Sequence, residues 1–439
     1  MAMAGSATTA AGRARLRRSD ARAIGAATLG WAVDMFDLMM VLNIAPQVSA
    51  AFFPTQNHLL GLTATYASFA ISLVIRPIGS VVFGALADRA GRRRSMTIAV
   101  LGAGVATALM GVLPGAVAIG AAAPIGVIVL RVVQGVFVGG ITASTHTLAT
   151  ETVPERFRGL TAGVIKGGGA SLAVALINVL IIVLDALIGT AAFDAWGWRV
   201  LFGFALVGSL LNLLLLRRTE ESPLWRRTEA PARHPARTLF SPRWRGLMVT
   251  SMLIVFTASA PYYLTTGILP TVYTEVFRLD QDVASALVII NVVGSALVAA
   301  VCGHLSQHVG RRKVFLVSGA ACLVLVPGLY GLMLALGSPG TGTVLAGSAV
   351  MVMASGAITS PLIIFLNERF PTGLRSTGTA VTWNIGYGLS GLMPTFVTAV
   401  SADDGAILPT LIATSLAIAV VFLALVAATA ETRGALARS

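Results

Sequence analysis

Long apolar segments alternate with short polar loops along almost the whole chain. A helix needs about 20 mostly apolar residues to cross a bilayer. In the first half such segments lie at 23–45, 62–86, 96–114, 122–148, 160–185 and 197–216. In the second half they lie at 247–268, 283–305, 314–336, 343–366, 376–400 and 406–429. The pattern predicts an all-α integral membrane protein with about twelve transmembrane helices, six in each half.

One stretch interrupts this pattern near the middle of the chain. Residues 217–245 carry a dense run of Arg, Glu and Pro, so we expect them to link the two halves. The predicted organisation is an N-terminal tail, an N-terminal bundle, the linker, a C-terminal bundle and a C-terminal tail. These occupy 1–22, 23–216, 217–245, 246–430 and 431–439.

The composition agrees with a membrane location. Only 11% of the residues are charged and 56% are hydrophobic, whereas a soluble domain has about 25% charged residues. The net charge of +13 would suggest nucleic-acid binding in a soluble protein, but its placement here favours membrane topology instead. When alternate loops are assigned to one side, that side holds all but five of the 31 Lys and Arg residues. The exceptions are Arg76, Arg131, Lys166, Arg199 and Arg278.

The basic side is predicted to be cytoplasmic, with both termini inside, because basic residues concentrate in cytoplasmic loops. We therefore expect a multi-pass protein of a cell membrane, specifically a bacterial plasma membrane. The expected partners are the lipid bilayer, a small solute and protons, with no nucleic acid. The protein is expected to be a monomer.

A loop signature occurs twice, about half the chain apart. The first copy, GALADRAGRRR, runs from Gly84 to Arg94, and the second, GHLSQHVGRRK, runs from Gly303 to Lys313. Each lies between two apolar segments. A second pair follows later in each half, ETVPERFRG from Glu151 and ERFPTGLRSTG from Glu368. Two similar halves, each mostly membrane, are typical of carriers.

These motifs resemble the major facilitator superfamily, and the resemblance covers nearly the whole chain. The run from Gly84 is similar to the family's G-x-L-x-D-R-x-G-R-R loop, and RVVQG from Arg131 is similar to its R-x-x-Q-G motif. GWAVDMFD from Gly30 resembles the aromatic-acid and sialic-acid proton symporters. RPIG from Arg76 and WGWR from Trp196 resemble the metabolite:proton symporters. The resemblance implies two six-helix bundles around a central cavity.

The resemblance also implies a conformational gate on the cytoplasmic side, which holds the outward-facing state closed there. The residues it assigns to this gate are Gly84, Asp88, Arg89, Gly91, Arg92, Glu151, Arg158, Gly303, Gly310 and Arg311. The second copy departs from the family pattern at Gln307, where an acid is common. The alternative is that these basic residues only set topology and contact anionic lipid.

Charged residues inside the spans are the candidates for coupling, since each costs at least a few kcal/mol to place in lipid. Asp34 and Asp37 lie three apart on one face of the first helix. Two neighbouring carboxylates in a low dielectric do not both ionise easily, so one is expected to carry the transported proton. The alternative is a structural hydrogen bond or an ion pair. The resemblance implies that Arg131 takes part in proton coupling, and a structural interhelical pair is the alternative.

The expected solute site combines cations of the first half with neutral groups of the second. Arg76 pairs either with Asp34 or Asp37 or with an anionic solute, and Lys166 either contacts that anion or extends to the cytoplasmic surface. The other candidates are Gln134, Tyr262, Trp383, Asn384 and Tyr387. Aromatic packing between helices is the alternative for the second half. Titratable groups cluster in the first half, so proton coupling is expected there.

The chain lacks the motifs of other function classes. It has no phosphate-binding G-x-x-x-x-G-K-[ST], so ATP is not expected to drive it directly. No Cys/His spacing suggests a metal, no cofactor is expected, and no nucleophile–base pattern suggests an enzyme. The predicted function is proton-coupled uptake of a small organic anion, such as a carboxylate or aromatic acid, by alternating access. The alternatives are proton-antiport efflux of a drug or acidic metabolite, and a sensor built on an inactive carrier.

Overall fold

The computed structural model describes residues 18–90, 92–152, 157–217, 241–370 and 372–434, and all regular structure in these segments is helical. Short π or 3-10 turns are labelled η. The N-terminal half contains α1 (Arg18–Asn43), α2 (Ala45–Phe52), α3 (His58–Ala90), α4 (Arg92–Val112), α5 (Ala116–Ile119), α6 (Ala122–Thr152), α7 (Arg158–Gly163), η2 (Val164–Gly168), α8 (Gly169–Ile188), α9 (Thr190–Ala195), η3 (Gly197–Arg199) and α10 (Val200–Arg217).

The C-terminal half begins with α13 at Pro242, slightly before the predicted boundary at 246. Proline suits the first helical turn, where its missing N–H would have no partner in any case. This half contains α13 (Pro242–Tyr262), η4 (Tyr263–Gly267), α14 (Leu269–Thr271), η5 (Val272–Val276), α15 (Gln281–Val309), α16 (Arg311–Leu336), α17 (Thr341–Thr359), α18 (Leu362–Arg369), α19 (Thr372–Ser390), α20 (Met393–Val400), η6 (Asp404–Ala406) and α21 (Ile407–Ala427). Most of the predicted linker, residues 218–240, lies outside the described residues.

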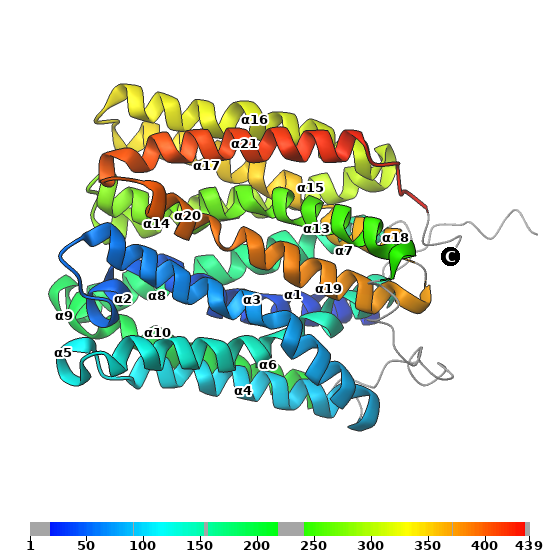
Figure 1. Cartoon of the computed structure of the whole chain (residues 1–439), viewed down its shortest axis with the longest axis horizontal. Coiled ribbons are helices and arrows are strands. Elements are labelled where there is room, and N and C mark those ends of the chain that lie inside the picture. Colours follow the sequence, from blue (N-terminus) through cyan, green and yellow to red (C-terminus); the bar gives the residue numbers. More distant parts are fainter. Residues whose placement is uncertain (1–17, 91, 153–156, 218–240, 371, 435–439) are drawn as a thin grey trace, which may run out of the picture.

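Each of the twelve predicted spans coincides with helix in the structure. Nine described helical stretches are long and apolar enough to cross a bilayer, and α1 with α2, bent by 68°, makes a tenth. The apolar part described for α4 is shorter, Thr97–Val112. The prediction of an all-α membrane fold is therefore confirmed. The helices run roughly along one common direction, and the C-terminus lies at the end where α1 begins (Figure 1).

Each half packs around its own helix pairs. In the N-terminal half α3 packs along α6 and α4 along α10, and in the C-terminal half α16 packs along α21 and α15 along α17. Two seams join the halves, because α3 contacts α19 and α20 while α15 contacts α7 and α8. Helices from both halves therefore enclose the centre of the molecule.

Two glycines of α6 let α3 approach very closely. A Cβ on Gly135 would lie 2.4 Å from the Ser72 carbonyl oxygen, and one on Gly139 would lie 2.1 Å from the Arg76 carbonyl oxygen. Small residues at helix contacts allow this kind of backbone approach in membranes. The contact holds the α3 segment that carries Arg76 against the core of the N-terminal bundle.

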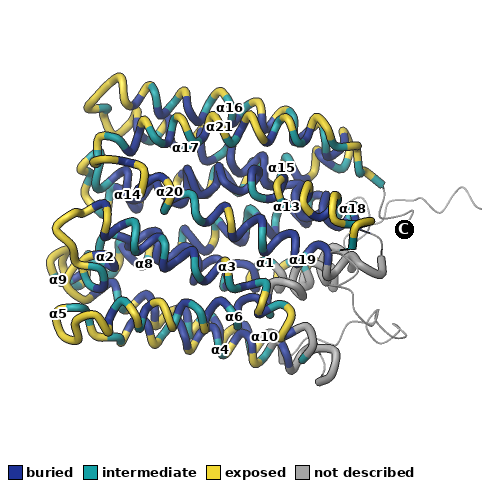
Figure 2. Tube along the Cα trace, viewed as in Figure 1, coloured by how far each residue is buried: buried dark blue, intermediate teal, exposed yellow. Residues whose placement is uncertain are grey.

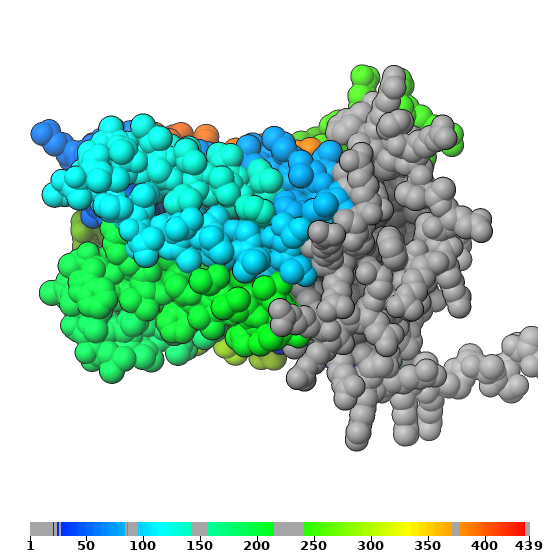
Figure 3. All heavy atoms as spheres, turned by 90° about the horizontal axis from the view of Figure 1, so that it is seen from below, coloured from blue at the N-terminus to red at the C-terminus, as the bar shows by residue number. Residues whose placement is uncertain are grey.

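Burial separates inner from outer helices (Figure 2). In the most apolar window of Thr341–Arg369, 83% of residues are buried, against 28% in the corresponding window of Asp404–Ala427. Figure 3 shows one side of the molecule, on which segments of the N-terminal half lie in front. The outer faces carry large exposed apolar side chains. They include Leu101, Val105, Leu109, Val129, Leu210, Val317, Val324 and Val420. Such a surface is unfavourable in water and suits lipid.

Candidate functional site

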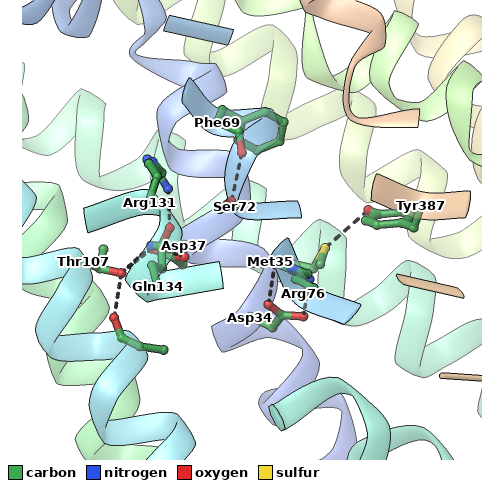
Figure 4. A network of polar contacts seen from close by, with 11 residues as sticks. Asp34, Met35, Asp37, Phe69, Ser72, Arg76, Thr107, Arg131, Gln134 and Tyr387 are labelled. Carbon is green, nitrogen blue, oxygen red and sulfur yellow. Dashed lines mark hydrogen bonds and ion pairs between the residues drawn. The ribbon is translucent and has the colours of Figure 1, made fainter. Parts of the chain in front are cut away.

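A buried ion pair joins α1 to α3 near the middle of both helices. The two terminal nitrogens of Arg76 donate to the two carboxylate oxygens of Asp34, at 3.1 and 3.4 Å (Figure 4). Each side chain is only 2% exposed. Two parallel N–H···O bonds fix the geometry of both partners. Of the partners expected for Arg76, the structure therefore shows Asp34.

Asp37 belongs to a different network, one turn further along α1. Thr107 donates to an oxygen of Asp37 at 2.6 Å, and Gln134 Nε2 donates to both oxygens at 2.6 and 2.5 Å. Arg131 donates to Gln134 Oε1 at 2.7 Å. Arg131 is thus joined to Asp37 through Gln134 rather than by a direct ion pair. This network ties α1, α4 and α6 together inside the N-terminal bundle (Figure 4).

The two carboxylates therefore have separate partners, although they lie three residues apart on α1. Asp34 faces α3 and a guanidinium, whereas Asp37 faces α4 and α6 and accepts from neutral groups. Neutralising Asp34 breaks a direct ion pair, while neutralising Asp37 does not. Gln134, expected in the solute site, is instead committed to the Asp37 network.

Lys166 lies in the π-helical turn η2, which interrupts the fifth span. π-turns are rare and are frequently found at functional sites. Its Nζ is 5.5 Å from the ring centre of Tyr262 and 5.3 Å from those of Trp383 and Tyr387. Lys166 is 3% exposed, so it does not extend to the surface. No carboxylate of the described residues lies within ion-pair distance of it.

The three rings around Lys166 form part of a larger aromatic cluster between the halves. Trp383 and Tyr387 stack with centroids 5.1 Å apart, and Tyr263 packs 5.3 Å from Tyr387. Trp31 of α1 meets Trp383 edge-on at 6.0 Å. The Tyr262 hydroxyl has no hydrogen-bond partner among the described residues. The rings are thus fixed by one another, and a polar atom remains available beside them.

Asn384 connects this cluster to the helix that carries Arg76. Its Nδ2 donates to Ser80 Oγ at 3.2 Å, and Ser80 Oγ donates in turn to the Arg76 carbonyl oxygen at 3.1 Å. Its Oδ1 has no partner in the described part of the chain. The Tyr387 hydroxyl contacts Met35 Sδ at 3.7 Å. Buried polar atoms normally have partners, so the unpaired hydroxyl of Tyr262, whose ring lies 5.5 Å from Lys166 Nζ, marks a place where a polar solute can bind.

The second copy of the repeated signature forms a charged cluster at one end of the C-terminal half. Arg311 donates to both oxygens of Glu368, at 3.0 and 3.1 Å, and to Gln307 Oε1 at 2.7 Å. Gln307 thus accepts from the same guanidinium as the acid of α18. Nearby, a Cβ on Gly303 would lie 2.6 Å from the Gly159 carbonyl oxygen, which shows how closely the halves approach.

The predicted gate includes residues of the first repeated signature and of the segment where α6 ends and α7 begins. The side chains of the first copy lie outside the described residues, and so does that of Glu151. These residues are Gly84, Asp88, Arg89, Gly91 and Arg92. Arg158 begins α7, beside the close contact of Gly159 with Gly303. Among the predicted gate residues, the structure therefore describes Arg158 of the first half and Gly303, Gly310 and Arg311 of the second.

Glu431, just after α21, caps the helix that carries Arg311. Gly310, at the start of α16, has φ of 104° and offers no capping side chain. The Glu431 carboxylate accepts from the backbone N–H groups of Arg311 at 2.8 Å and of Arg312 at 3.0 Å. Partial burial alone would raise the pKa of Glu431, but these and two further backbone donors, Arg433 and Thr432, lower it overall. A negative charge at a helix N-terminus is favourable.

Sequence analysis missed several members of these networks. Thr107 is one hydroxyl in an apolar helix, and nothing in its spacing indicated a partner. Trp31 lies inside the motif around Asp34, and Glu368 begins the second member of the later repeated pair. Their positions in these motifs could have marked both residues as candidates. Tyr263 follows Tyr262 and begins the π-turn η4, and a helical period does not predict such a turn.

Comparison with known proteins identifies the family. Residues 25–395 match the family model described as Major Facilitator Superfamily. The glycine betaine/proline/ectoine/pipecolic acid transporter OusA of Dickeya dadantii (strain 3937) is 28% identical over 386 residues, 85% of this chain and 76% of OusA. The inner membrane metabolite transport protein YhjE of Escherichia coli (strain K12) is 29% identical over 373 residues, 82% of this chain and 83% of YhjE.

Solved structures share the fold. The partially occluded inward open conformation of the xylose transporter XylE from E. coli aligns with a TM-score of 0.70, covering 94% of this chain and 99% of that one. The identity is 18%, so this likeness concerns the arrangement of helices alone. It agrees with the two helical halves described above.

Proposed function

The chain belongs to the Major Facilitator Superfamily, so it is a multi-pass membrane transport protein rather than an enzyme, and we propose that it takes up a small carboxylate-bearing zwitterion with protons. The observation that carries this proposal is Lys166. It is a fully enclosed cation with no carboxylate partner among the described residues, and it lies between the two halves.

The solute carboxylate is proposed because of the balance of buried charge. Arg76 is paired with Asp34, and Arg131 is linked to Asp37 through Gln134. Lys166 is the further cation of this central region. A buried charge without a partner is costly, so an arriving carboxylate would be attracted to it. The proposed solute therefore carries a carboxylate, as the sequence predicts.

Proton coupling is proposed to use the two carboxylates differently. Asp37 can accept a proton without the loss of a direct ion pair, and both carboxylates lie on α1. Removing its negative charge strengthens the positive field around Arg76 and Lys166, which favours binding of the solute carboxylate. Such linkage is reciprocal, so the bound carboxylate also favours protonation. Arg76 can then exchange Asp34 for the solute as the halves move.

The zwitterionic character is proposed from the relatives together with the aromatic rings. OusA and the proline/betaine transporter of E. coli are named for proline or betaine, solutes that carry a positive nitrogen beside the carboxylate. Aromatic rings such as Trp383 recognise substituted ammonium groups. We therefore propose, in place of the organic anion expected from the sequence, a carboxylate with an internal positive charge and no net charge.

The test is uptake of labelled proline and glycine betaine into proteoliposomes under an imposed inward proton gradient. Accumulation that a protonophore abolishes is expected, and uptake indifferent to the gradient would remove proton coupling. A zwitterion moved with one proton carries net positive charge, so an inside-negative potential should accelerate uptake. A monoanion moved with one proton would show no such response. Accumulation driven by an outward gradient would favour the efflux alternative.

A further inference from the structure

The ammonium group of Lys166 occupies an aromatic cage contributed by the other half of the molecule. Lys166 belongs to η2 in the N-terminal half, while Tyr262 lies on α13, and Trp383 and Tyr387 lie on α19. We propose that Lys166 is a built-in substitute for the solute's own ammonium, and that a zwitterion binds by displacing it from this cage. This inference rests on the proposed function and concerns how its site discriminates between solutes.

The cage has the geometry that a substituted ammonium requires. Three ring centres lie 5.3 to 5.5 Å from Nζ, within the roughly 6 Å at which a cation is attracted to a ring face. Trp383 and Tyr387 stack on each other, within 16° of parallel and with ring centres 5.1 Å apart, so each fixes the orientation of the other. Trp383 and Tyr387 are 2% and 1% exposed, which makes the attraction stronger than it would be in water.

Lys166 can leave this cage because nothing else in the described structure holds its ammonium. No hydrogen bond or ion pair of Lys166 accompanies the three ring contacts. Its stem is a flexible four-carbon chain. Gly167 and Gly163 next to it pack against Ala299 of α15, so the backbone is anchored while the side chain is not. The ammonium can therefore move without a change in the helix.

Displacement makes both charges of the solute necessary. The incoming ammonium takes the place of Nζ among the rings, and the carboxylate pairs with the released Lys166. A cation without a carboxylate would expel Lys166 and leave it buried and unpaired, which is costly. A carboxylate without a cation would have to draw Lys166 away from the rings and leave the cage empty. Neutral or singly charged solutes are thereby rejected.

The test compares three probes of similar shape on the full-length protein in nanodiscs. Glycine betaine carries both charges, 3,3-dimethylbutanoate replaces trimethylammonium by tert-butyl, and choline lacks the carboxylate. Affinity is measured by calorimetry without any proton gradient. Glycine betaine is expected to bind at least about tenfold more tightly than either of the others, which corresponds to one desolvated cation–π contact or ion pair.

Substitution of Lys166 is expected to change the affinities for choline and glycine betaine in opposite directions, whereas substitution of Trp383 is expected to lower both. Lys166→Met empties the cage and removes the carboxylate's partner, so choline should gain about tenfold in affinity while glycine betaine loses at least that much. A misfolded protein cannot gain affinity, so this result does not depend on unchanged stability. Trp383→Leu should weaken both probes, and Trp383→Phe should restore part of the binding. Phe396→Leu, on an exposed aromatic of α20, is the matched control.

Two results would overturn the inference. One is equal affinity for glycine betaine and 3,3-dimethylbutanoate, which would mean that the solute binds while Lys166 stays in the cage. The other is the absence of a gain for choline in Lys166→Met. Failure of the proposed function looks different. Selective binding without proton-driven flux would refute the coupling alone, whereas proton-driven uptake of proline and glycine betaine combined with equal affinity for 3,3-dimethylbutanoate would refute the displacement alone.

Discussion

The two halves of this transporter place their charges at different depths. In the N-terminal half, Asp34, Arg76 and Asp37 lie in the middle of their helices and are buried. In the C-terminal half, the buried ion pair of Arg311 and Glu368 lies where α16 begins and α18 ends. The middle of that half instead holds aromatic rings and neutral hydrogen bonds.

This difference indicates a division of work between halves of similar architecture. Charged groups at mid-membrane can change partner when a proton or an ion arrives, because each partner is costly to leave unpaired there. Neutral and aromatic groups can recognise a solute without changing state. The N-terminal half is thus suited to coupling and the C-terminal half to recognition, with Lys166 reaching from one to the other.

The largest effect is expected for Asp37→Asn, which tests coupling in the N-terminal half. Asparagine can still accept from Thr107 and Gln134, but its charge no longer changes. Gradient-driven uptake should be abolished while exchange of labelled for unlabelled solute continues. Both are measured in the same proteoliposome preparation. Normal driven uptake in this variant would remove Asp37 from the coupling mechanism.

The next prediction compares the loss of stability when the buried ion pair of each half is broken by substitution of its arginine. Arg76→Gln leaves Asp34 without its cation at mid-membrane and should destabilise the protein by about 3–5 kcal/mol. Arg311→Gln should cost less, about 1–3 kcal/mol, because Thr432 still donates to Glu368 at 2.9 Å. Unfolding can be followed by thiol-dye labelling of Cys322, which is buried in α16. Equal losses of unfolding free energy in the two variants would contradict the proposed difference between a charge at mid-membrane and one at a helix end.

Much of this organisation could be predicted from the sequence because it depends on composition. Twelve apolar segments, the placement of arginines and the repeated loop signature indicated the family, and rare charges inside spans indicated the centre. The sequence could not tell that Asp34 and Asp37 turn to different helices. Their spacing puts them on one face, but the partner of each depends on how α3, α4 and α6 pack around α1, which the spacing along one helix does not give.

The direction in which the Lys166 side chain extends could likewise not be predicted from the sequence. Helical rise gave its depth, and both surface extension and solute contact were consistent with that depth. Lys166 lies in the π-turn η2, and the π-turn η4 begins directly after Tyr262; no residue pattern indicated either turn. These local departures from the regular helical period are therefore a part of the site around Lys166 that the sequence could not predict.

A smaller effect is expected in the neutral centre of the C-terminal half. Asn291 Nδ2 donates to the Tyr273 hydroxyl at 2.9 Å and to Ser348 Oγ at 2.9 Å. Tyr273→Phe removes one of these acceptors and should cost about 1 kcal/mol in stability. Proton coupling should be unchanged, since no charged group takes part. A loss of gradient-driven uptake with retained exchange would refute the assignment of coupling to the N-terminal half.

The smallest effect concerns the end of the C-terminal half, where Glu431 caps α16. Because the pKa of Glu431 is lowered in the folded protein, its contribution is present above the ordinary carboxyl value of 4.5 and is lost as pH falls through the lower folded value. Glu431→Gln should therefore cost about 0.5 kcal/mol at neutral pH, because an exposed cap is screened by water. As pH falls below 4.5 and through the lower folded value, the variant and the original protein should converge in stability.

Convergence of the two stabilities at low pH would show that Glu431 acts through its charge and not through its packing. Thiol-dye unfolding of both proteins across this pH range measures the difference directly, and Glu431→Asp, which keeps the charge, is the matched control. If Glu431→Gln were equally destabilising at every pH, the carboxylate would act through its size and hydrogen bonds rather than through its charge at the start of α16. The end of the C-terminal half would then resemble its neutral centre, and the contrast in charge depth would rest on Arg311 and Glu368 alone.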